Sequence, residues 1–170
     1  MASKRHQLAQ ANIARMRGRL EDPIMDGFRK QLDWVNAVAD RSPGFVWRLQ
    51  TPEGDATTIR VFDDDRILFN MSVWDSLEAL HQYVYGSDHV GPLRNRRDWF
   101  EPVAGPNLVL WWIPMGAMPT IEEAKTKLQM LKDQGPSPLA FTMRRPFPPP
   151  GMPPTPFPEV GAEFCGGTAC

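Results

Sequence analysis

The residues best suited to acid-base chemistry gather in one short stretch, between Tyr83 and Arg97. His89 lies in a turn between two expected helices, and a histidine titrates near neutral pH, so it is our candidate general base. Arg94 and Arg97 are three residues apart, which places both guanidinium groups on one face of a helix, within reach of one carboxylate or enol oxygen. The stretch therefore predicts proton abstraction by His89 from an acidic C–H or O–H, with Arg94 or Arg97 stabilising the resulting anion.

The same residues have a second interpretation, in which they only stabilise the fold. His89 would then make a helix-capping hydrogen bond, and the arginines would pair with Asp98, Glu101 or the acidic turn 63–65. Three adjacent aspartates in a turn are typical of a solvated loop rather than of a cation site. The sequence has no P-loop, no GxGxxG motif after a strand, no HExxH and no CxxC, so it predicts neither a metal nor a cofactor.

Aromatic residues supply a second set of candidates. Trp111 and Trp112 are adjacent on an expected strand, so their side chains point to opposite sides of the sheet, one toward the helices and the other toward a dimer partner. Core packing is one interpretation of the tryptophans. The other is an aromatic wall around a flat organic ligand, and the candidates for it are Trp47, Trp74 and Trp111.

The hydrophobic pattern predicts the elements that position these residues. It predicts strands over 7–14, 45–50, 67–74 and 107–114, and a short ribbon over 57–62. It predicts helices over 23–41, 76–85, 92–100 and 121–134. Asp75 and Thr120 each precede a glutamate by three residues, which is the spacing of a capping box. Strict alternation in the second strand would place Phe45 and Trp47 on one face and Arg48 on the other.

These elements run in the order β-α-β-β-α-β, followed by one extra helix. Such a unit predicts an α+β, ferredoxin-like fold, in which a four-stranded antiparallel sheet carries helices on one face. The other face is apolar and needs a cover, so we expect a homodimer in which two sheets close on each other. We expect the domain over residues 1–135 and a Pro-rich C-terminal arm and tail over 136–170, since ten of the 18 prolines follow residue 135.

Composition bounds the class of protein. The 170 residues suffice for one core, and 42% hydrophobic residues indicate a folded chain. The formal net charge of -1 gives no general attraction to nucleic acid or to a membrane surface, and no apolar run approaches the ~20 residues of a membrane span. Cys165 and Cys170 both lie in the tail, so no disulfide framework is expected. We expect a cytoplasmic protein without nucleic-acid or membrane partners.

Six stretches carry a resemblance to a known family: GFVWRLQ (44–50), NMSVWDSLEALHQYVY (70–85), WFEP (99–102), LVLWWIP (108–114), PTIEEA (119–124) and FTMRRPFPPP (141–150). Residues 6–148 resemble a bacterial family of unassigned function in the dimeric α+β barrel superfamily, which includes the antibiotic-biosynthesis monooxygenases. The resemblance implies the barrel fold and a homodimer. Superfamily members include cofactor-independent oxygenases of aromatic polyketides, haem-degrading enzymes, cyclases, isomerases and dehydratases.

The resemblance also implies residues of a substrate site. Haem-degrading members have an asparagine on the first strand, which Asn12 matches. Their tryptophan on the second helix is replaced by Tyr83, and their ligand histidine falls at Leu93 or Arg94. We expect the substrate to be bound by Asn12, Trp47, Trp74, Tyr83 and Trp111.

Three functions are compatible with these features. The leading hypothesis is a small-molecule enzyme acting by proton abstraction on an aromatic or polyketide-like metabolite, as a cofactor-independent monooxygenase, a cyclase or an isomerase. The alternative is a non-catalytic metabolite-binding module whose Pro-rich arm recruits a partner. The third is a haem-binding protein that uses His89 or His81.

Overall fold

The computed structural model of the chain describes residues 5–154 apart from 53, 55, 58 and 87–95. Six elements form the predicted β-α-β-β-α-β unit: β1 (His6–Met16), α1 (Asp26–Arg41), β2 (Phe45–Arg48), β3 (Ile67–Trp74), α2 (Leu77–Tyr85) and β5 (Leu108–Pro114). Four more complete the fold: η1 (Pro23–Met25), α4 (Arg96–Trp99), β4 (Phe100–Glu101) and α5 (Ile121–Gln134).

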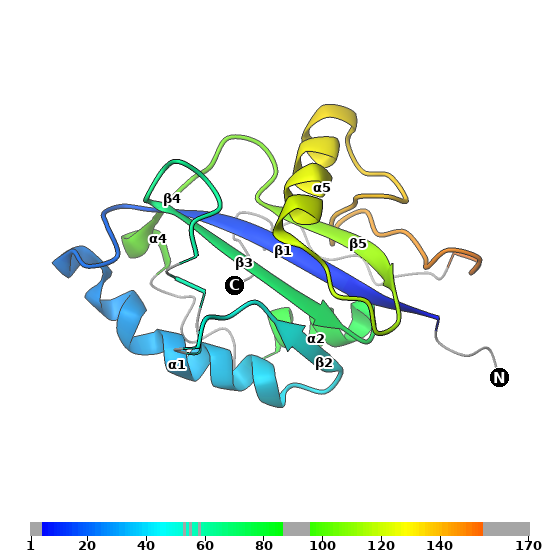
Figure 1. Cartoon of the computed structure of the whole chain (residues 1–170), viewed down its shortest axis with the longest axis horizontal. Coiled ribbons are helices and arrows are strands. Elements are labelled where there is room, and N and C mark those ends of the chain that lie inside the picture. The colour runs from blue at the N-terminus through cyan, green and yellow to red at the C-terminus, as the bar shows by residue number, and fades with distance from the viewer. Residues whose placement is uncertain (1–4, 53, 55, 58, 87–95, 155–170) are drawn as a thin grey trace.

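All strand pairs of the sheet are antiparallel, and the long strand β1 lies at its centre (Figure 1). β1 pairs with β3 along one side, where Asn12 faces Asn70, and with β5 along the other, where Ala9 faces Trp111. β2 extends the sheet beyond β3. The order β2-β3-β1-β5 is ferredoxin-like, so the predicted α+β class and topology are confirmed. The two-residue strand β4 adds a fifth strand, which pairs with the end of β1.

The starts of two helices follow from side-chain caps. α2 begins after Ser76, whose Oγ accepts the N–H of Ala79 at 3.1 Å. The prediction that Asp75 caps this helix is wrong by one residue, because its carboxylate instead accepts a hydrogen bond from Gln7 Nε2. α5 begins after the predicted cap Thr120, whose Oγ1 accepts a hydrogen bond from the backbone N–H of Glu123 at 3.1 Å.

In three segments the secondary structure differs from the prediction. Asp22-Pro23 opens the 3-10 turn η1, and the α-helix α1 starts only at Asp26. The described residues of 57–62 form no strand. Of the helix predicted from Pro92, α4 occupies the C-terminal end, and residues 92–95 lie outside the described part of the chain.

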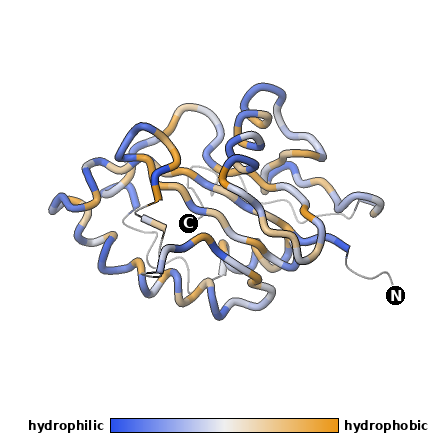
Figure 2. Tube along the Cα trace, viewed as in Figure 1, coloured by the Kyte–Doolittle hydropathy of each residue, from blue (hydrophilic) through white to orange (hydrophobic). Residues whose placement is uncertain are grey.

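One face of the sheet packs against α1 and α2. Leu8 of β1, Trp74 of β3 and Leu110 of β5 point to this side, where they form one buried cluster with Leu80 and Val84 of α2. The tube of α1 alternates between hydrophobic and hydrophilic positions (Figure 2). Within the described residues, none of the helices has the length and apolar character to span a membrane.

The opposite face of the sheet is covered by the same chain. α5 packs Leu128 against it, and the loop before β3 adds Phe62. As a result Phe69 and Trp111, which point to this side, are only 2% and 1% exposed in a single chain. The expectation that this face is bare is therefore wrong, because α5 takes the place assigned to a second copy. The homodimer itself stays a prediction.

A bulge in β2 changes which side chains face the helices. Phe45 and Arg48 pair with Trp74 and Ser72 of β3, which share the helix-side face. Trp47, between them, points to the opposite face and packs against the α5-side cluster. The alternation predicted for this strand is wrong because the irregularity between Phe45 and Trp47 shifts the register by one residue.

The residues that follow α5 run back along β5. The backbones of Phe141 and Leu110 exchange two hydrogen bonds, at 2.9 and 2.8 Å. Further on, Trp112 Nε1 donates to the carbonyl oxygen of Phe147 at 2.8 Å. The described beginning of the Pro-rich segment is thus attached to the edge strand of the sheet.

Candidate functional site

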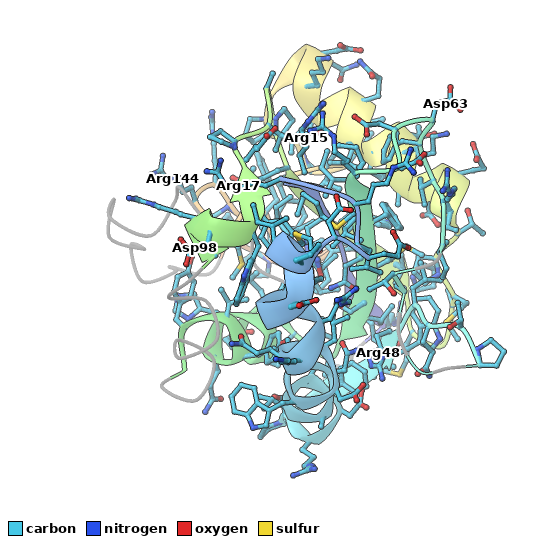
Figure 3. The ribbon with its side chains drawn as sticks, turned by 90° about the vertical axis from the view of Figure 1, so that its left-hand side faces the viewer. Arg15, Arg17, Arg48, Asp63, Asp98 and Arg144 are labelled. Carbon is cyan, nitrogen blue, oxygen red and sulfur yellow. The ribbon has the colours of Figure 1, made fainter. Side chains whose placement is uncertain are left out.

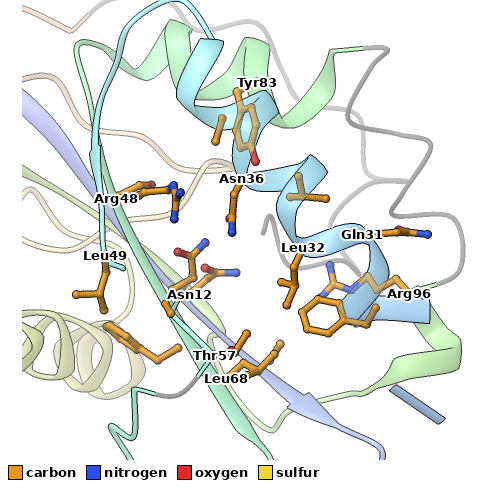
Figure 4. Close-up of a pocket in the computed structure, with 18 of the residues that line it drawn as sticks. Asn12, Gln31, Leu32, Asn36, Arg48, Leu49, Thr57, Leu68, Tyr83 and Arg96 are labelled. Atoms are coloured by element: carbon orange, nitrogen blue, oxygen red, sulfur yellow. The ribbon is translucent and has the colours of Figure 1, made fainter. Parts of the chain in front are cut away.

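A cavity of about 110 Å3 lies between the sheet and helix α1 (Figure 4). The helix-side face of β1, β2 and β3 forms its floor, and α1 forms the wall opposite, with Leu32 and Val35 among the lining residues. Trp99 and Phe100 line it near the start of α1, where the Phe28 ring lies 5.1 Å from that of Phe100. Most of the wall is therefore apolar or aromatic, as is typical of small-molecule sites.

Four hydrogen-bonding side chains follow one another on the helix side of the sheet, and we call Trp74, Ser72, Gln10 and Asn12 the polar row. Trp74, Ser72 and Asn12 line the cavity, and Gln10 links Ser72 to Asn12. Trp74 Nε1 donates to Ser72 Oγ at 2.9 Å. Ser72 Oγ donates to Gln10 Oε1 at 3.0 Å, and Gln10 Nε2 donates to Asn12 Oδ1 at 3.1 Å. All four are buried. The row ends at Asn12, which points into the cavity beside its strand partner Asn70.

Arg48 brings a positive charge to the edge of the cavity. Its side chain is only 11% exposed, and its Nη1 donates to the carbonyl oxygen of Gly54 at 2.7 Å. Its Nε and Nη2 bind the carboxylate of Asp40, which is itself 45% exposed at the end of α1. Figure 4 shows the guanidinium of Arg48 on the cavity side of β2, across from Asn36 of α1.

Tyr83 reaches the cavity from α2. Its ring is stacked on that of Trp74, with centroids 4.9 Å apart and an interplanar angle of 27°. The hydroxyl group extends from this stack toward Asn36 (Figure 4). Asn12, Arg48 and Tyr83 thus present hydrogen-bonding groups to one apolar space from three different elements.

The two arginines of α4 have different environments. Arg96 lines the cavity, with its guanidinium carbon 5.7 Å from the centre of the Phe100 ring. Arg97 is exposed and does not line it. The carbonyl oxygen of Arg97 accepts a hydrogen bond from Arg17 Nε at 2.7 Å, and Arg17 and Asp98 lie on the same side of the molecule (Figure 3).

The structure brings together only part of the predicted site. The predicted residues that line the cavity are Asn12, Trp74 and Tyr83. Trp47 and Trp111 lie on the opposite face of the sheet, where Trp111 Nε1 donates to Glu123 Oε1 at 3.0 Å. His89 and Arg94 lie outside the described residues. His81, the second haem-ligand candidate, is half-buried on α2 with its ring 4.6 Å from that of Tyr85, away from the cavity wall.

Sequence reasoning missed several polar residues of the cavity. Arg48 was not predicted to line the cavity because the prediction assumed strict alternation in β2, and no sequence pattern indicated the bulge. Asn70 and Ser72 did carry a signal, because polar residues at every second position of an otherwise apolar strand indicate a polar stripe on one face. Asn36 interrupts the apolar stripe of α1 in the same way.

The described wall of the cavity favours negative charge. Arg48 and Arg96 contribute positive charges, and among the described lining residues there is no carboxylate and no histidine. Elsewhere in the described part of the chain, no three His, Cys, Asp or Glu side chains come together as a metal site would require. The polar groups of the described wall are therefore two guanidinium groups together with uncharged amide and hydroxyl groups, set in an apolar surface.

Fold and cavity together define an α+β protein of ferredoxin-like topology with a small-molecule-sized space under its helices. Residues 7–156 match the family described as "Domain of unknown function (DUF3291)", and the chain belongs to this family. The match agrees with the resemblance seen in the sequence, to a family of unassigned function with the fold of the antibiotic-biosynthesis monooxygenases. No curated protein matches the chain.

Several solved structures are similar to part of the chain, at low sequence identity and with TM-scores below 0.5. One is SnoaB, a cofactor-independent oxygenase from Streptomyces nogalater (16% identity, 67% of this chain and 95% of that chain covered, TM-score 0.41). Another is PA3566 from Pseudomonas aeruginosa (10% identity, 68% and 100% covered, TM-score 0.45). A third is a putative antibiotic biosynthesis monooxygenase from Chloroflexus aurantiacus (15% identity, 68% and 98% covered, TM-score 0.37). Similarity at this level does not extend to activity.

Proposed function

We propose that the chain is an enzyme acting on a small aromatic or polyketide-like metabolite, which binds in the cavity and reacts through its enolate or phenolate form. The observation that carries this proposal is the set of hydrogen-bonding groups, Asn12, Arg48 and Tyr83, placed in an otherwise apolar space. An apolar cavity opposes charge, so an anion forms there only where donors stabilise it. Donors fixed before the reaction stabilise a developing oxyanion without reorganising.

The proposed reaction begins with a proton transfer. The C–H or O–H bond of the substrate breaks, the proton goes to His89, and the electron pair stays on the substrate as an enolate or phenolate. His89 and Arg94 keep the roles of base and anion-stabilising group as proposals. Of the two α4 arginines, Arg96 is the better candidate for the stabilising role, because it lines the cavity and Arg97 is exposed. Oxygenation, cyclisation or isomerisation would start from this anion.

Ionisation of a bound probe tests the anion-stabilising part of the proposal. 2-Naphthol is a flat phenol whose anion absorbs at longer wavelength than the neutral form. We expect binding to lower its apparent pKa by about one unit, which is about 1.4 kcal/mol in favour of the anion. Binding with an unchanged or raised pKa would contradict the proposed stabilisation.

Turnover tests the base. Anthrone has an acidic methylene group next to a carbonyl, and oxygen uptake or loss of its absorbance reports reaction. We expect His89→Ala to slow this reaction by about 100-fold or more, whereas His81→Ala, a histidine away from the cavity wall, leaves the rate unchanged. Equal rates in the two variants would remove His89 from the mechanism.

A non-catalytic metabolite-binding module is the second candidate. The observation that favours it is the composition of the described wall, which offers donors but no carboxylate or histidine to take a proton. This function predicts saturable binding of 2-naphthol and anthrone without conversion of either compound. Prolonged incubation of the complex with oxygen, followed by mass spectrometry of the extracted compound, distinguishes it from the enzyme.

A further inference from the structure

The guanidinium group of Arg48 has more hydrogen-bond donors than the described part of the chain uses. A guanidinium group carries five N–H donors. Three hydrogen bonds join that of Arg48 to the described residues: Nε and Nη2 donate to the carboxylate of Asp40, and Nη1 donates to the carbonyl oxygen of Gly54. One N–H group on each of Nη1 and Nη2 is left for another acceptor, although the side chain is only 11% exposed.

The acceptor has to come from the cavity side. The guanidinium group of Arg48 lies on the cavity side of β2, and Asn36 of α1 lies across from it (Figure 4). Asn36 is four residues before Asp40, so both side chains extend from the same face of α1. An acceptor between Arg48 and Asn36 would therefore meet a cation on one side and an amide group on the other.

Arg48 lies near one end of the cavity. Its partner Asp40 is at the C-terminal end of α1, whereas the Phe28 ring, near the N-terminal end, packs against Phe100 at 5.1 Å. Phe28 and Asp40 are twelve residues apart, which is about 18 Å along the helix axis. Arg96 lines the cavity beside Phe100. The two arginines of the wall therefore lie toward opposite ends of α1, as Figure 4 shows.

A carboxylate is the group that suits this position best. A guanidinium group is planar and permanently charged, and its N–H donors match the geometry of a carboxylate. Asp40 is 45% exposed, so it compensates the buried charge of Arg48 only in part. The described lining residues include no carboxylate, so a ligand has to supply the second one. Because three hydrogen bonds already fix the guanidinium group, binding costs little side-chain entropy.

We infer that Arg48 binds a carboxylate of the substrate, so that the cavity selects flat aromatic carboxylic acids over neutral compounds of the same shape. Arg48 is the specificity-determining residue, and the reacting oxygen of the substrate lies away from it, toward the α4 end of the cavity. Asp40 is a positioning residue, which fixes the guanidinium group and also reduces its attraction for a second anion. This inference rests on the proposed function, since it names the substrate class of the same cavity.

A matched pair of probes tests the selectivity. 2-Naphthoate and 2-naphthamide have the same ring system and nearly the same shape, but only 2-naphthoate is an anion at neutral pH. Isothermal titration of the full chain with each compound gives the ratio of the two dissociation constants. We expect 2-naphthoate to bind about tenfold more tightly, because only its charge is complementary to that of the guanidinium group.

Four variants locate the carboxylate. Arg48→Met keeps the length of the side chain and removes its charge, so the ratio should fall to about one or two. Asn36→Asp places a carboxylate across from Arg48 at unchanged size and should lower the ratio to a similar value. Asp40→Asn removes the compensating charge and should tighten binding of 2-naphthoate alone by about threefold. Arg60→Met is the control, because it changes the net charge as Arg48→Met does, but Arg60 is 69% exposed and does not line the cavity.

The outcomes distinguish this inference from the proposed function. Equal affinity for the two probes, or tighter binding of 2-naphthamide, overturns the inference and leaves the cavity as a ligand site. A ratio that stays near tenfold in Arg48→Met and Asn36→Asp, or an affinity for 2-naphthoate that Asp40→Asn leaves unchanged, overturns the assignment to Arg48. Binding of neither probe also overturns the inference, and the ionisation of 2-naphthol then decides on the proposed function separately. Should Arg48→Met fail to fold, the wild-type ratio and Asn36→Asp still decide.

Discussion

Arg48 of β2 donates two hydrogen bonds to the carboxylate of Asp40 at the end of α1, from Nε to Oδ1 at 2.8 Å and from Nη2 to Oδ2 at 3.3 Å. This bidentate contact connects α1, which lines one wall of the cavity, to β2, which lines the opposite wall. The guanidinium is largely buried and the carboxylate is half-exposed. Arg48 therefore lines the cavity with its charge partly compensated by Asp40.

A double-mutant cycle measures this contact. Arg48→Met keeps the length of the side chain, and Asp40→Asn keeps its shape. We expect a coupling free energy of about 1 kcal/mol, above the usual value for exposed ion pairs because Arg48 is buried and binds in a bidentate manner. Urea denaturation of the four proteins gives this number. A coupling near zero would mean that solvent screens the pair despite its geometry.

Filling the cavity should block the site without unfolding the chain. Ala39 is 7% exposed and lines the cavity from α1. We expect Ala39→Leu to weaken binding of 2-naphthoate and 2-naphthol by about tenfold or more, while the free energy of unfolding changes by less than about 1 kcal/mol because the added methyl groups enter empty space. Titration calorimetry and thermal unfolding check the two parts. Undiminished binding would place the probes elsewhere on the protein.

Ser76 caps the N-terminus of α2, the helix that carries Tyr83, and its contribution to stability can be measured. Ser76→Ala removes the oxygen that accepts the N–H of Ala79 and should cost about 1 kcal/mol of stability. Ser76→Asp keeps an acceptor at the helix start and should cost less. Chemical denaturation gives both values. Equal losses in the two variants would show that the hydroxyl matters for another contact than the cap.

The contact between α5 and the sheet can be isolated in the same way. Glu123→Ala removes the acceptor of the Trp111 indole N–H, which is buried with its ring. We expect a loss of about 1 to 2 kcal/mol. Glu122→Ala is the matched control, since it removes a first-turn carboxylate that is exposed and so reports only the helix-dipole contribution. Equivalent losses would indicate that the hydrogen bond to Trp111 adds nothing.

Much of the fold was predictable because its patterns are local. The alternation of β3 predicted that Phe69, Met71 and Val73 share one face of the sheet, and in the structure all three belong to the buried cluster on the α5 side. The N-cap at Thr120 was likewise found where its residue types predict it, and the carboxylate of Glu123 accepts a hydrogen bond from Trp111. The cap of α2 was missed because Asp75 and Ser76 are both good caps, and the choice depends on Gln7, 68 residues away, which binds Asp75.

The cavity was less predictable because its composition depends on contacts between distant segments. Asn12 and Tyr83 were predicted from the family resemblance. Trp111 and Trp112 are equivalent in sequence, and only the packing of α5 and of the chain near Phe147 decides their surroundings. Arg48 lines the cavity because the register of β2 shifts between Phe45 and Trp47, and this shift is visible only in the pairing of β2 with β3.

The position of α5 has a consequence for how the protein responds to dilution. A fold whose apolar sheet face is completed by another subunit loses that cover as the protomer concentration falls, and its melting temperature falls with it. Here Leu128 and its neighbours on α5 are covalently part of the chain they cover. This face of the sheet therefore keeps its cover at any concentration, and we expect a melting temperature that does not change on dilution.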